Sequence, residues 1–367
     1  MEREIPLYTL SGVNDAAIST HHFDTEDKLG LSLMRYYRDE CKNVVVIIHG
    51  LTTSSDMFIM PEHENLVMFL LTHGFTDVWT FDFRMSNRHI YNLRPHRYSM
   101  DDCALYDHPA AIDLVRSVVG SDKKVHVICH CLGSVSFVMS LFAKKLTGVA
   151  SVVANSVALT PRIPKWSLTK GKVFPFVLEY ILDIPYVSPR WDDDPHWSRG
   201  KLIGKLVSLF HRECDVPACH MLSLMWGTGW PALYEHENLA DVTHRRGGDL
   251  YGGTSLNYHR HVMMMVDNNN TAVRMYPDKA AHSSLPVNYF QYAAEVTTPV
   301  LFMTGANNRV FTDSNIVCYE RLKELVPENP HELLKVEGYG HQDVFMGKNV
   351  AKDVFPKFMP FIEKHAA

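Results

Sequence analysis

The stretch that decides the fold, KKVHVICHCLGSVSF, occupies positions 123–137. Its first half alternates like a β-strand, and its second half is typical of a helix. Between the two halves stand two thiols and an imidazole, those of Cys129, His130 and Cys131. A strained strand-to-helix turn that exposes a nucleophile needs small residues two positions before and two positions after that nucleophile. Cys129 and Gly133 meet this requirement, so the pattern predicts that Cys131 is the nucleophile of an enzyme.

Segments with strand and helix patterns alternate on both sides of this turn. The expected strands cover 31–37, 42–50, 76–84, 125–129, 149–159, 298–305 and 331–341. The expected helices cover 64–74, 101–120 and 134–146, a further helix begins near Asp313, and the closing helix ends near Lys364. The strand at 42–50 is a continuous apolar run, which is typical of a parallel strand buried on both faces. The alternation predicts an α/β fold, with a mostly parallel open sheet covered on both faces by helices.

The alternation stops at Pro161 and resumes near residue 295. The segment between them is rich in proline and aromatic residues and contains polar loops such as HRRGGDLYGGTS and DNNNTA. We interpret 161–294 as an inserted cap on a core that is formed by 1–160 plus 295–367.

Length and composition exclude several classes of protein. The chain has 367 residues, 46% of them hydrophobic, and can bury a large core. Its formal net charge of -5 supplies no basic surface for nucleic acid. No run of about 18 apolar residues is present and the N-terminus is polar, so we expect no integral membrane segment and no signal peptide. The seven cysteines are an odd number, which favours reduced thiols and a cytoplasmic location.

No G-x-G-x-x-G sequence follows a predicted strand, so a dinucleotide site has no support. We therefore expect no cofactor. The oligomeric state is left open by the sequence.

Three further positions suit a mechanism that begins at Cys131. His341 follows the last predicted strand, where a catalytic histidine is expected when the nucleophile comes first along the chain. The backbone amides of Leu51, at the end of the interior strand, and Leu132, directly after the nucleophile, are the expected oxyanion hole. A Cys–His pair can also exist as thiolate and imidazolium, which would activate the sulfur.

The residue that orients His341 is where the sequence departs from the usual pattern. An acid is expected about three positions after Gly305, but that position holds Asn308. An amide can still form one hydrogen bond to an imidazole, so Asn308 is the first candidate. Asp313 and Asp343 are the alternatives, although either can equally serve a helix N-terminus.

The predicted cap contains one more group of chemically active side chains, in HRECDVPACH at 211–220. His211, Cys214, Cys219 and His220 are ligand types that could hold zinc. Their spacing differs from that of the usual zinc fingers, and adjacent ligands at 219 and 220 would strain a tetrahedral site. We therefore predict buried thiols or a local disulfide here, and no metal.

The motifs HGL, FDFRMS, ICHCLGS, TGANN and GYGH resemble the α/β-hydrolase superfamily over nearly the whole chain except the cap. More narrowly, HCLGS, DHPAAI, ALYEHENL, DVTH and GYGHQDVFMGKN resemble the hydrolase-like portion found beside glucose-methanol-choline flavoprotein oxidases of the cholesterol-oxidase type. The flavin portion is absent from this chain. The narrower resemblance implies a sterol or lipid setting. Dienelactone hydrolase and polyhydroxyalkanoate synthase also use a cysteine nucleophile, but they carry an Asp where this chain has Asn308.

A thiol nucleophile forms an acyl-thioester intermediate, which water, an alcohol, an amine or a thiol can resolve. We therefore expect an esterase or thioesterase that acts on a small-molecule substrate with an apolar, lipid-like acyl group. One alternative is an acyltransferase that passes the acyl group from Cys131 to another acceptor. Another alternative, of a different class, is a catalytically silent ligand-binding protein on the same fold.

Overall fold

The computed structural model describes residues 10–192, 196–211, 213–227 and 232–367. Its centre is an eight-stranded sheet with the order β1-β2-β4-β3-β5-β6-β9-β10. The strands are β1 (Ala17–Asp24), β2 (Gly30–Tyr37), β3 (Asn43–Ile48), β4 (Asp77–Asp82), β5 (Lys124–His130), β6 (Val149–Asn155), β9 (Val300–Gly305) and β10 (Glu332–Val336). β1 pairs with β2 and β2 with β4 in antiparallel fashion, and every other pairing in this sheet is parallel. The predicted α/β class and the mostly parallel sheet are confirmed.

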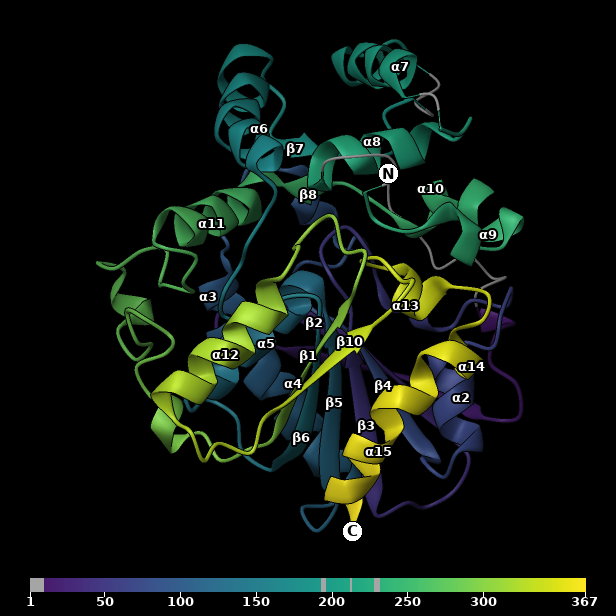
Figure 1. The fold of residues 1–367 in the computed structure, drawn as a ribbon, viewed down its shortest axis with the longest axis vertical. Coiled ribbons are helices and arrows are strands. Elements are labelled where there is room, and N and C mark those ends of the chain that lie inside the picture. The colour runs from purple at the N-terminus through teal and green to yellow at the C-terminus, as the bar shows by residue number, and fades with distance from the viewer. Residues whose placement is uncertain (1–9, 193–195, 212, 228–231) are drawn as a thin grey trace.

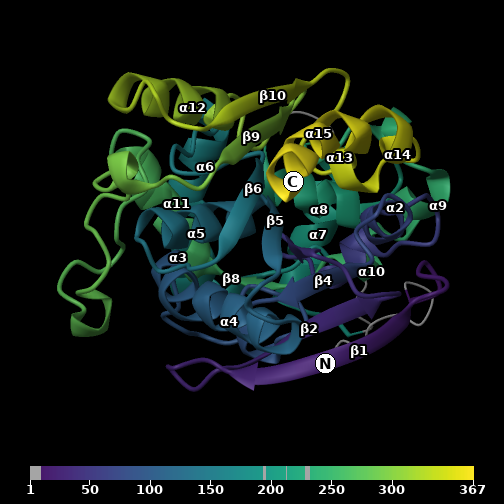
Figure 2. The same ribbon diagram turned by 90° about the horizontal axis from the view of Figure 1, so that it is seen from below.

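Helices cover both faces of the sheet, as predicted. Helices α2 and α15 lie on one face, and α4, α5 and α12 lie on the other (Figure 2). Their bounds are α2 (Leu66–Thr72), α4 (His108–Val119), α5 (Cys131–Phe142), α12 (Ser314–Leu325) and α15 (Phe355–Ala366). A short helix, α3 (Met100–Asp102), and a π-helical turn at Cys103–Asp107 precede α4, and α13 (Asp343–Met346) and α14 (Val350–Asp353) precede α15.

The interior strands form the centre of the core because their side chains are apolar on both faces. Val44 to Ile48 in β3 are at most 1% exposed, and every residue of β4 is buried. The sequence did not predict β1, whose residues are mostly exposed and polar. An edge strand of this kind carries little of the apolar pattern that marks an interior strand.

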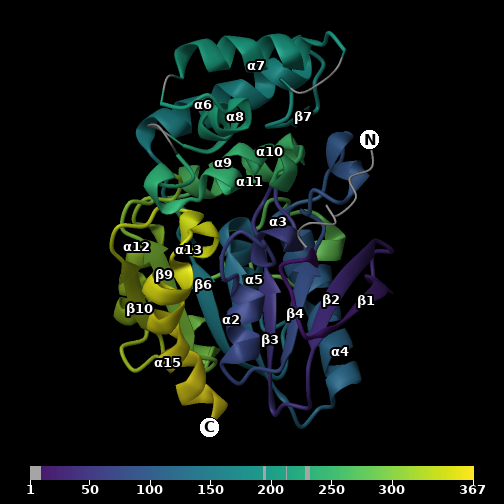
Figure 3. The same ribbon diagram turned by 90° about the vertical axis from the view of Figure 1, so that its right-hand side faces the viewer.

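Most of the predicted cap lies above the carboxyl ends of the parallel strands (Figures 1 and 3). It contains α6 (Lys165–Phe176), β7 (Tyr186–Val187), α7 (Arg199–Phe210), α8 (Pro217–Trp226), α9 (Asp241–Arg245), α10 (Gly247–Leu250), β8 (Thr254–Ser255) and α11 (Leu256–Asp267). A separate small apolar cluster around Leu178, Met221 and Leu256 packs within it. The outer face of the cap is also apolar, since Leu206, Leu209 and Phe210 of α7 are at least 48% exposed.

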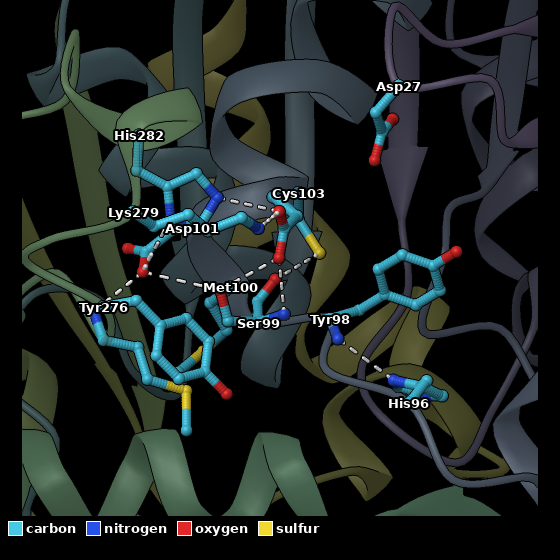
Figure 4. A network of polar contacts seen from close by, with 12 residues as sticks. Asp27, His96, Tyr98, Ser99, Met100, Asp101, Cys103, Tyr276, Lys279 and His282 are labelled. Atoms are coloured by element: carbon cyan, nitrogen blue, oxygen red, sulfur yellow. Dashed lines mark hydrogen bonds and ion pairs between the residues drawn. The ribbon is translucent and has the colours of Figure 1, made fainter.

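The last part of the predicted insertion descends beside the core (Figure 1). Its residues are tied to the start of α3 by buried carboxylates (Figure 4). Asp101 accepts a hydrogen bond from the Tyr289 hydroxyl at 2.8 Å. Asp102 lies 2.7 Å from the Lys279 ammonium group and 2.8 Å from Nε2 of His282. Residues 271–294 therefore pack as an extension of the core, and the boundary at 294 stays a prediction.

No helix in the described part of the chain is long and apolar enough to cross a membrane.

Candidate active site

Cys131 occupies a strained turn between β5 and α5. Its φ is +54°, in the left-handed region that a residue with a Cβ seldom adopts. A Cβ added to Gly133 would lie 2.0 Å from the carbonyl oxygen of His49, and one added to Gly50 would lie 2.6 Å from Cβ of Cys131. Neither position tolerates a side chain, because the backbone of β3 passes so close to the turn. This is the geometry that a nucleophile elbow requires.

Cys129, at the other flanking position, is fully buried, and its sulfur lies 3.5 Å from the carbonyl oxygen of Val153. It points into the sheet, whereas Cys131 borders a cavity. Of these two neighbouring thiols, Cys131 is the one that a substrate can reach.

Two backbone amides point at the Cys131 sulfur. They are the N–H groups of Leu51 and Leu132, and both stabilise the thiolate form of the side chain. Donors fixed in this way can also stabilise the oxyanion that forms when a nucleophile attacks a carbonyl group. The structure thus brings the two predicted amides together at Cys131.

His341 reaches the same point from the loop after β10. One ring nitrogen each of His130 and His341 and the sulfur of Cys131 lie within 4.8 Å of one another. The rings of His130 and His341 have centroids 4.8 Å apart, and both side chains are buried. The sequence analysis gave His130 no function. The structure shows that its side chain lines the cavity at Cys131.

A small cavity adjoins these residues. Its lining residues are Gly50, Leu51, Thr52, His130, Cys131, Trp226, Leu233, His341 and Gln342. Trp226 and Leu233 come from the cap, so the cap covers the nucleophile. Trp226 also lines a second, largely apolar cavity between α6, α8 and α11. The ring of Phe311, which lines that second cavity, lies 5.9 Å from the ring of His341.

Comparison with known proteins identifies the family to which this arrangement belongs. The sequence pattern of the “Alpha/beta hydrolase family” matches residues 45–341, from β3 to His341. The chain belongs to the α/β-hydrolase family. The first of the two resemblances drawn from the sequence is therefore confirmed.

Several relatives of this α/β-hydrolase carry lipase or esterase names. A Schizosaccharomyces pombe protein named “Probable lipase C16A3.12c” is 20% identical, over 98% of this chain and 80% of its own length. “Lipase 1” of Drosophila melanogaster is 34% identical over 126 residues, which are 32% of this chain and 28% of that protein. A monoacylglycerol lipase structure from Paleococcus ferrophilus shares 15% identity over 92% of this chain and 100% of its own, with a TM-score of 0.52. At that identity the structural likeness establishes the fold alone.

The α/β-hydrolase triad has a third member that orients the histidine, and none of the three predicted candidates forms this contact. The side-chain oxygen of Asn308 accepts hydrogen bonds from the N–H groups of Val310 and Phe311, each at 3.0 Å, and its amide nitrogen lies 3.4 Å from the Thr304 hydroxyl. Asn308 thus closes its own loop. Its predicted role as the orienting residue stays a prediction that these contacts do not support.

The two aspartates are engaged elsewhere. Asp313 forms an ion pair with Arg162 at 2.7 Å near the surface. Asp343 is buried and accepts hydrogen bonds from the backbone N–H of Gly340 at 2.9 Å and from the side chain of Asn238 at 2.7 Å. Among the described residues, the buried Nδ1 atom of His341 has no hydrogen-bond partner. The structure therefore brings Cys131 and His341 together as a Cys–His dyad, and the third member of the predicted triad stays a prediction.

Burial determines the protonation of this dyad. It raises the pKa of the Cys131 thiol to about 12, although the N–H groups of Leu132 and Leu51 oppose the shift. Burial also lowers the pKa of His341 to about 3. Both shifts favour a neutral thiol and a neutral imidazole. These shifts do not support the expected thiolate–imidazolium pair in the ligand-free protein, because the sequence pattern gave no measure of how deeply both groups are buried.

Proposed function

We propose that this α/β-hydrolase is a thiol-dependent acyl hydrolase, an esterase or thioesterase that works through an acyl-Cys131 intermediate. One observation carries the proposal. Cys131 stands at a left-handed turn with two backbone N–H donors at its sulfur and a ring nitrogen of His341 within 4.8 Å. The lipase names of its sequence relatives agree with an acyl hydrolase.

His341 acts as a general base, since it is neutral in the ligand-free protein and can accept the thiol proton. As the proton leaves, the sulfur attacks the carbonyl carbon of the substrate, and the resulting oxyanion is held by the N–H groups of Leu51 and Leu132. The tetrahedral intermediate collapses, the alcohol or thiol leaves with the proton from His341, and an acyl thioester remains on Cys131. His341 then takes a proton from water, the hydroxide attacks the thioester, and the acid leaves as the thiol is restored.

The cap supplies a place for an apolar acyl group. The cavity between α6, α8 and α11 is lined largely by apolar side chains and shares Trp226 with the cavity at Cys131. Such a lining suits an apolar ligand group. The exposed apolar residues of α7 would suit an enzyme that meets aggregated apolar substrates. The resemblance to the hydrolase-like portion beside cholesterol-oxidase-type flavoproteins implies a lipid or sterol substrate. We include that substrate class in this proposal.

The test is turnover of chromogenic phenyl esters and thioesters whose acyl chains increase in length. We expect kcat/KM to rise with acyl length until the cap cavity is filled, and to vanish in Cys131→Ala. Cys318→Ala is the matched control, because that thiol is equally buried but lies on α12, away from the site. Hydrolysis that survives in Cys131→Ala would refute the proposal. Adding an alcohol or thiol acceptor distinguishes hydrolysis from acyl transfer, since a transferase would divert the product from acid to a new ester.

A ligand-binding protein without turnover is the second candidate, and one observation favours it. The Nδ1 atom of His341 has no partner among the described residues, so no hydrogen bond fixes the ring for proton transfer. Binding of a long-chain ester analogue by wild type, without turnover of any ester in the series, would support this alternative.

A further inference from the structure

The cap contains a second cluster of cysteine and histidine side chains, distinct from the one at Cys131. The sulfurs of Cys214 and Cys219 and one ring nitrogen each of His236 and His244 all lie within 4.8 Å of one another. Cys214 precedes α8, Cys219 lies in its first turn, His236 follows in a short 3₁₀ turn, and His244 lies on α9. Two separate segments of the cap thus converge on one point.

This set of four donors matches the size and chemistry of a tetrahedral zinc site. Zinc takes sulfur ligands at about 2.3 Å and imidazole nitrogens at about 2.0 Å, which places neighbouring donor atoms roughly 3.3 to 3.8 Å apart. The sulfur of Cys219 and Nε2 of His236 are already 3.4 Å apart. The spacing Cys214-x4-Cys219 lies within the range of known structural zinc sites, whereas His236-x7-His244 is longer than the usual spacing of about three to five residues. It is therefore the convergence of the four donors in space that indicates a zinc site. Small inward movements of side chains would complete the coordination.

The polar groups of the cluster also point to a missing partner. The Nε2 atom of His244 is buried and has no hydrogen-bond partner among the residues the structure describes. Both cysteines are free thiols. The sequence pattern favoured either buried thiols or a Cys214–Cys219 disulfide. A disulfide would give the two histidine side chains no function, whereas a metal ion would bind all four side chains.

The sequence pattern had grouped these cysteines with other histidines. His220 lies 3.5 Å from the sulfur of Cys214, but its ring nitrogens are engaged with the Ser208 hydroxyl at 3.0 Å and the Cys214 carbonyl oxygen at 2.9 Å. It therefore holds the loop that presents Cys214. The backbone N–H of Val216 also points at the Cys214 sulfur. Such outer contacts orient the ligands of a metal.

We propose that Cys214, Cys219, His236 and His244 bind one zinc ion as a closed, structural site. Two thiolates and two imidazoles suit zinc better than magnesium or calcium, which prefer oxygen ligands. Four protein ligands leave no open position for a water or a substrate, so the ion stabilises the fold.

The ion would fasten the two cap segments that cover Cys131. Helix α8 ends at Trp226, which lines the cavity at the nucleophile. On the other segment, the carbonyl of Leu233 accepts a hydrogen bond from the N–H of Gln342 at 2.8 Å, and the side chain of Asn238 donates to the carboxylate of Asp343 at 2.7 Å. The residues on either side of His236 thus support the loop that carries His341. Any effect of the ion on turnover rests on the proposed function, whereas the metal site itself does not.

The experiment measures metal content in protein that has been produced with zinc and purified without chelators or a histidine tag. We expect one zinc per chain in wild type, and loss of most of it in Cys214→Ser and in His244→Ala. Cys41→Ser is the matched control, because that thiol is also partly buried and free, and it should keep the ion. Cys131→Ser should keep it too, which separates the cap from the cluster at the nucleophile.

Cobalt exchanged into wild type should give the visible absorption bands of a tetrahedral site and a thiolate-to-cobalt charge-transfer band. Both should disappear in His244→Ala. If the cysteine variants fail to fold, wild type from which a chelator has removed the zinc takes their place. Two more thiols should then react with a thiol reagent than in the zinc-bound protein, and added zinc should protect them again. Wild type without zinc or cobalt binding, or with a Cys214–Cys219 disulfide in its peptide map, would overturn the proposal. These readouts do not use ester turnover, so they remain valid if the proposed hydrolase activity fails.

Discussion

The molecule holds cysteine and histidine side chains together in two places, and we propose a different chemistry for each of them. At β5–α5, one thiol meets two imidazoles, and in the cap two thiols meet two imidazoles, in each case within 4.8 Å. The first cluster has a cysteine with a φ of +54°, two backbone N–H donors at its sulfur and a cavity beside it. The second has four donors, and neither cysteine has a positive φ.

The difference lies in the backbone and in the number of donors. The two N–H groups at Cys131 lie beside a cavity where a substrate carbonyl can enter, so they suit an oxyanion. Four soft donors around one point favour a cation. We therefore assign reactivity to Cys131 and coordination to Cys214 and Cys219.

The largest effect should come from removing the nucleophile. Cys131→Ala should lower kcat/KM by roughly 10⁴-fold or more, and Cys131→Ser should keep only a trace, because the neutral His341 is a weak base for a hydroxyl group. Both variants should retain the cap zinc. Ester turnover and metal content, measured on the same preparations, test this. Wild-type turnover in the serine variant would contradict the assigned dependence on a thiol.

Removing the base should have the next largest effect. His341→Ala should lower kcat by roughly 10² to 10⁴-fold, the usual contribution of general base catalysis. KM should change little, since the apolar cap cavity is intact. Steady-state kinetics on a short activated ester check this, with His220→Ala as the comparison in the cap. If His220→Ala lowers kcat as much as His341→Ala, the base is misassigned.

Asn308 should affect stability more than turnover. Asn308→Ala leaves the buried N–H groups of Val310 and Phe311 without their acceptor, so the free energy of unfolding should fall by about 1–3 kcal/mol. Asn308→Asp keeps that acceptor and should preserve most of the stability. Denaturant unfolding and kcat are measured for both variants. A drop in kcat of roughly ten- to a thousandfold in Asn308→Ala, with unchanged stability, would instead restore its predicted role in orienting His341.

The smallest expected effect is that of mild acid on the rate. His341 is neutral above its lowered pKa of about 3, and the thiol of Cys131 stays protonated below about 12. Both groups therefore keep their active forms between pH 5 and pH 8, and kcat/KM should be flat across that range. An acid limb with a midpoint near the ordinary pKa of histidine, about 6.5, would mean that His341 still acts as a neutral base but that burial does not lower its pKa in the working enzyme.

The sequence predicted those features whose residues lie close together in the chain, and it missed those that join distant residues. The elbow lies within five residues, so Cys131, Leu132 and the small flanking positions were visible in the chain. The cap cluster joins residues up to thirty positions apart. They lie in a segment where strand and helix patterns do not alternate, so the sequence did not show which residues would meet. His236 and His244 were therefore not recognised as partners of Cys214 and Cys219.

The strand that precedes Asn308 ends at Gly305, as predicted, so Asn308 lies three residues after it. The direction of the Asn308 side chain was not predictable from the sequence. The N–H groups of Val310 and Phe311, which lie in the same loop as Asn308, donate to its side-chain oxygen. They therefore compete with His341 for that side chain. Similarly, burial of Cys131 and His341 depends on cap residues such as Trp226 and Leu233, which come from distant parts of the sequence.

The most direct test of the central claim is to trap the acyl group. Wild type mixed with an activated ester of medium chain length is quenched in acid within one turnover, and the peptide that contains Cys129 and Cys131 is fragmented by mass spectrometry. We expect one acyl group as a thioester on Cys131, absent from Cys131→Ala and accumulating in His341→Ala only at a much reduced rate. An acyl group on Cys129, Cys214 or a serine, in protein that turns over the ester, would contradict it.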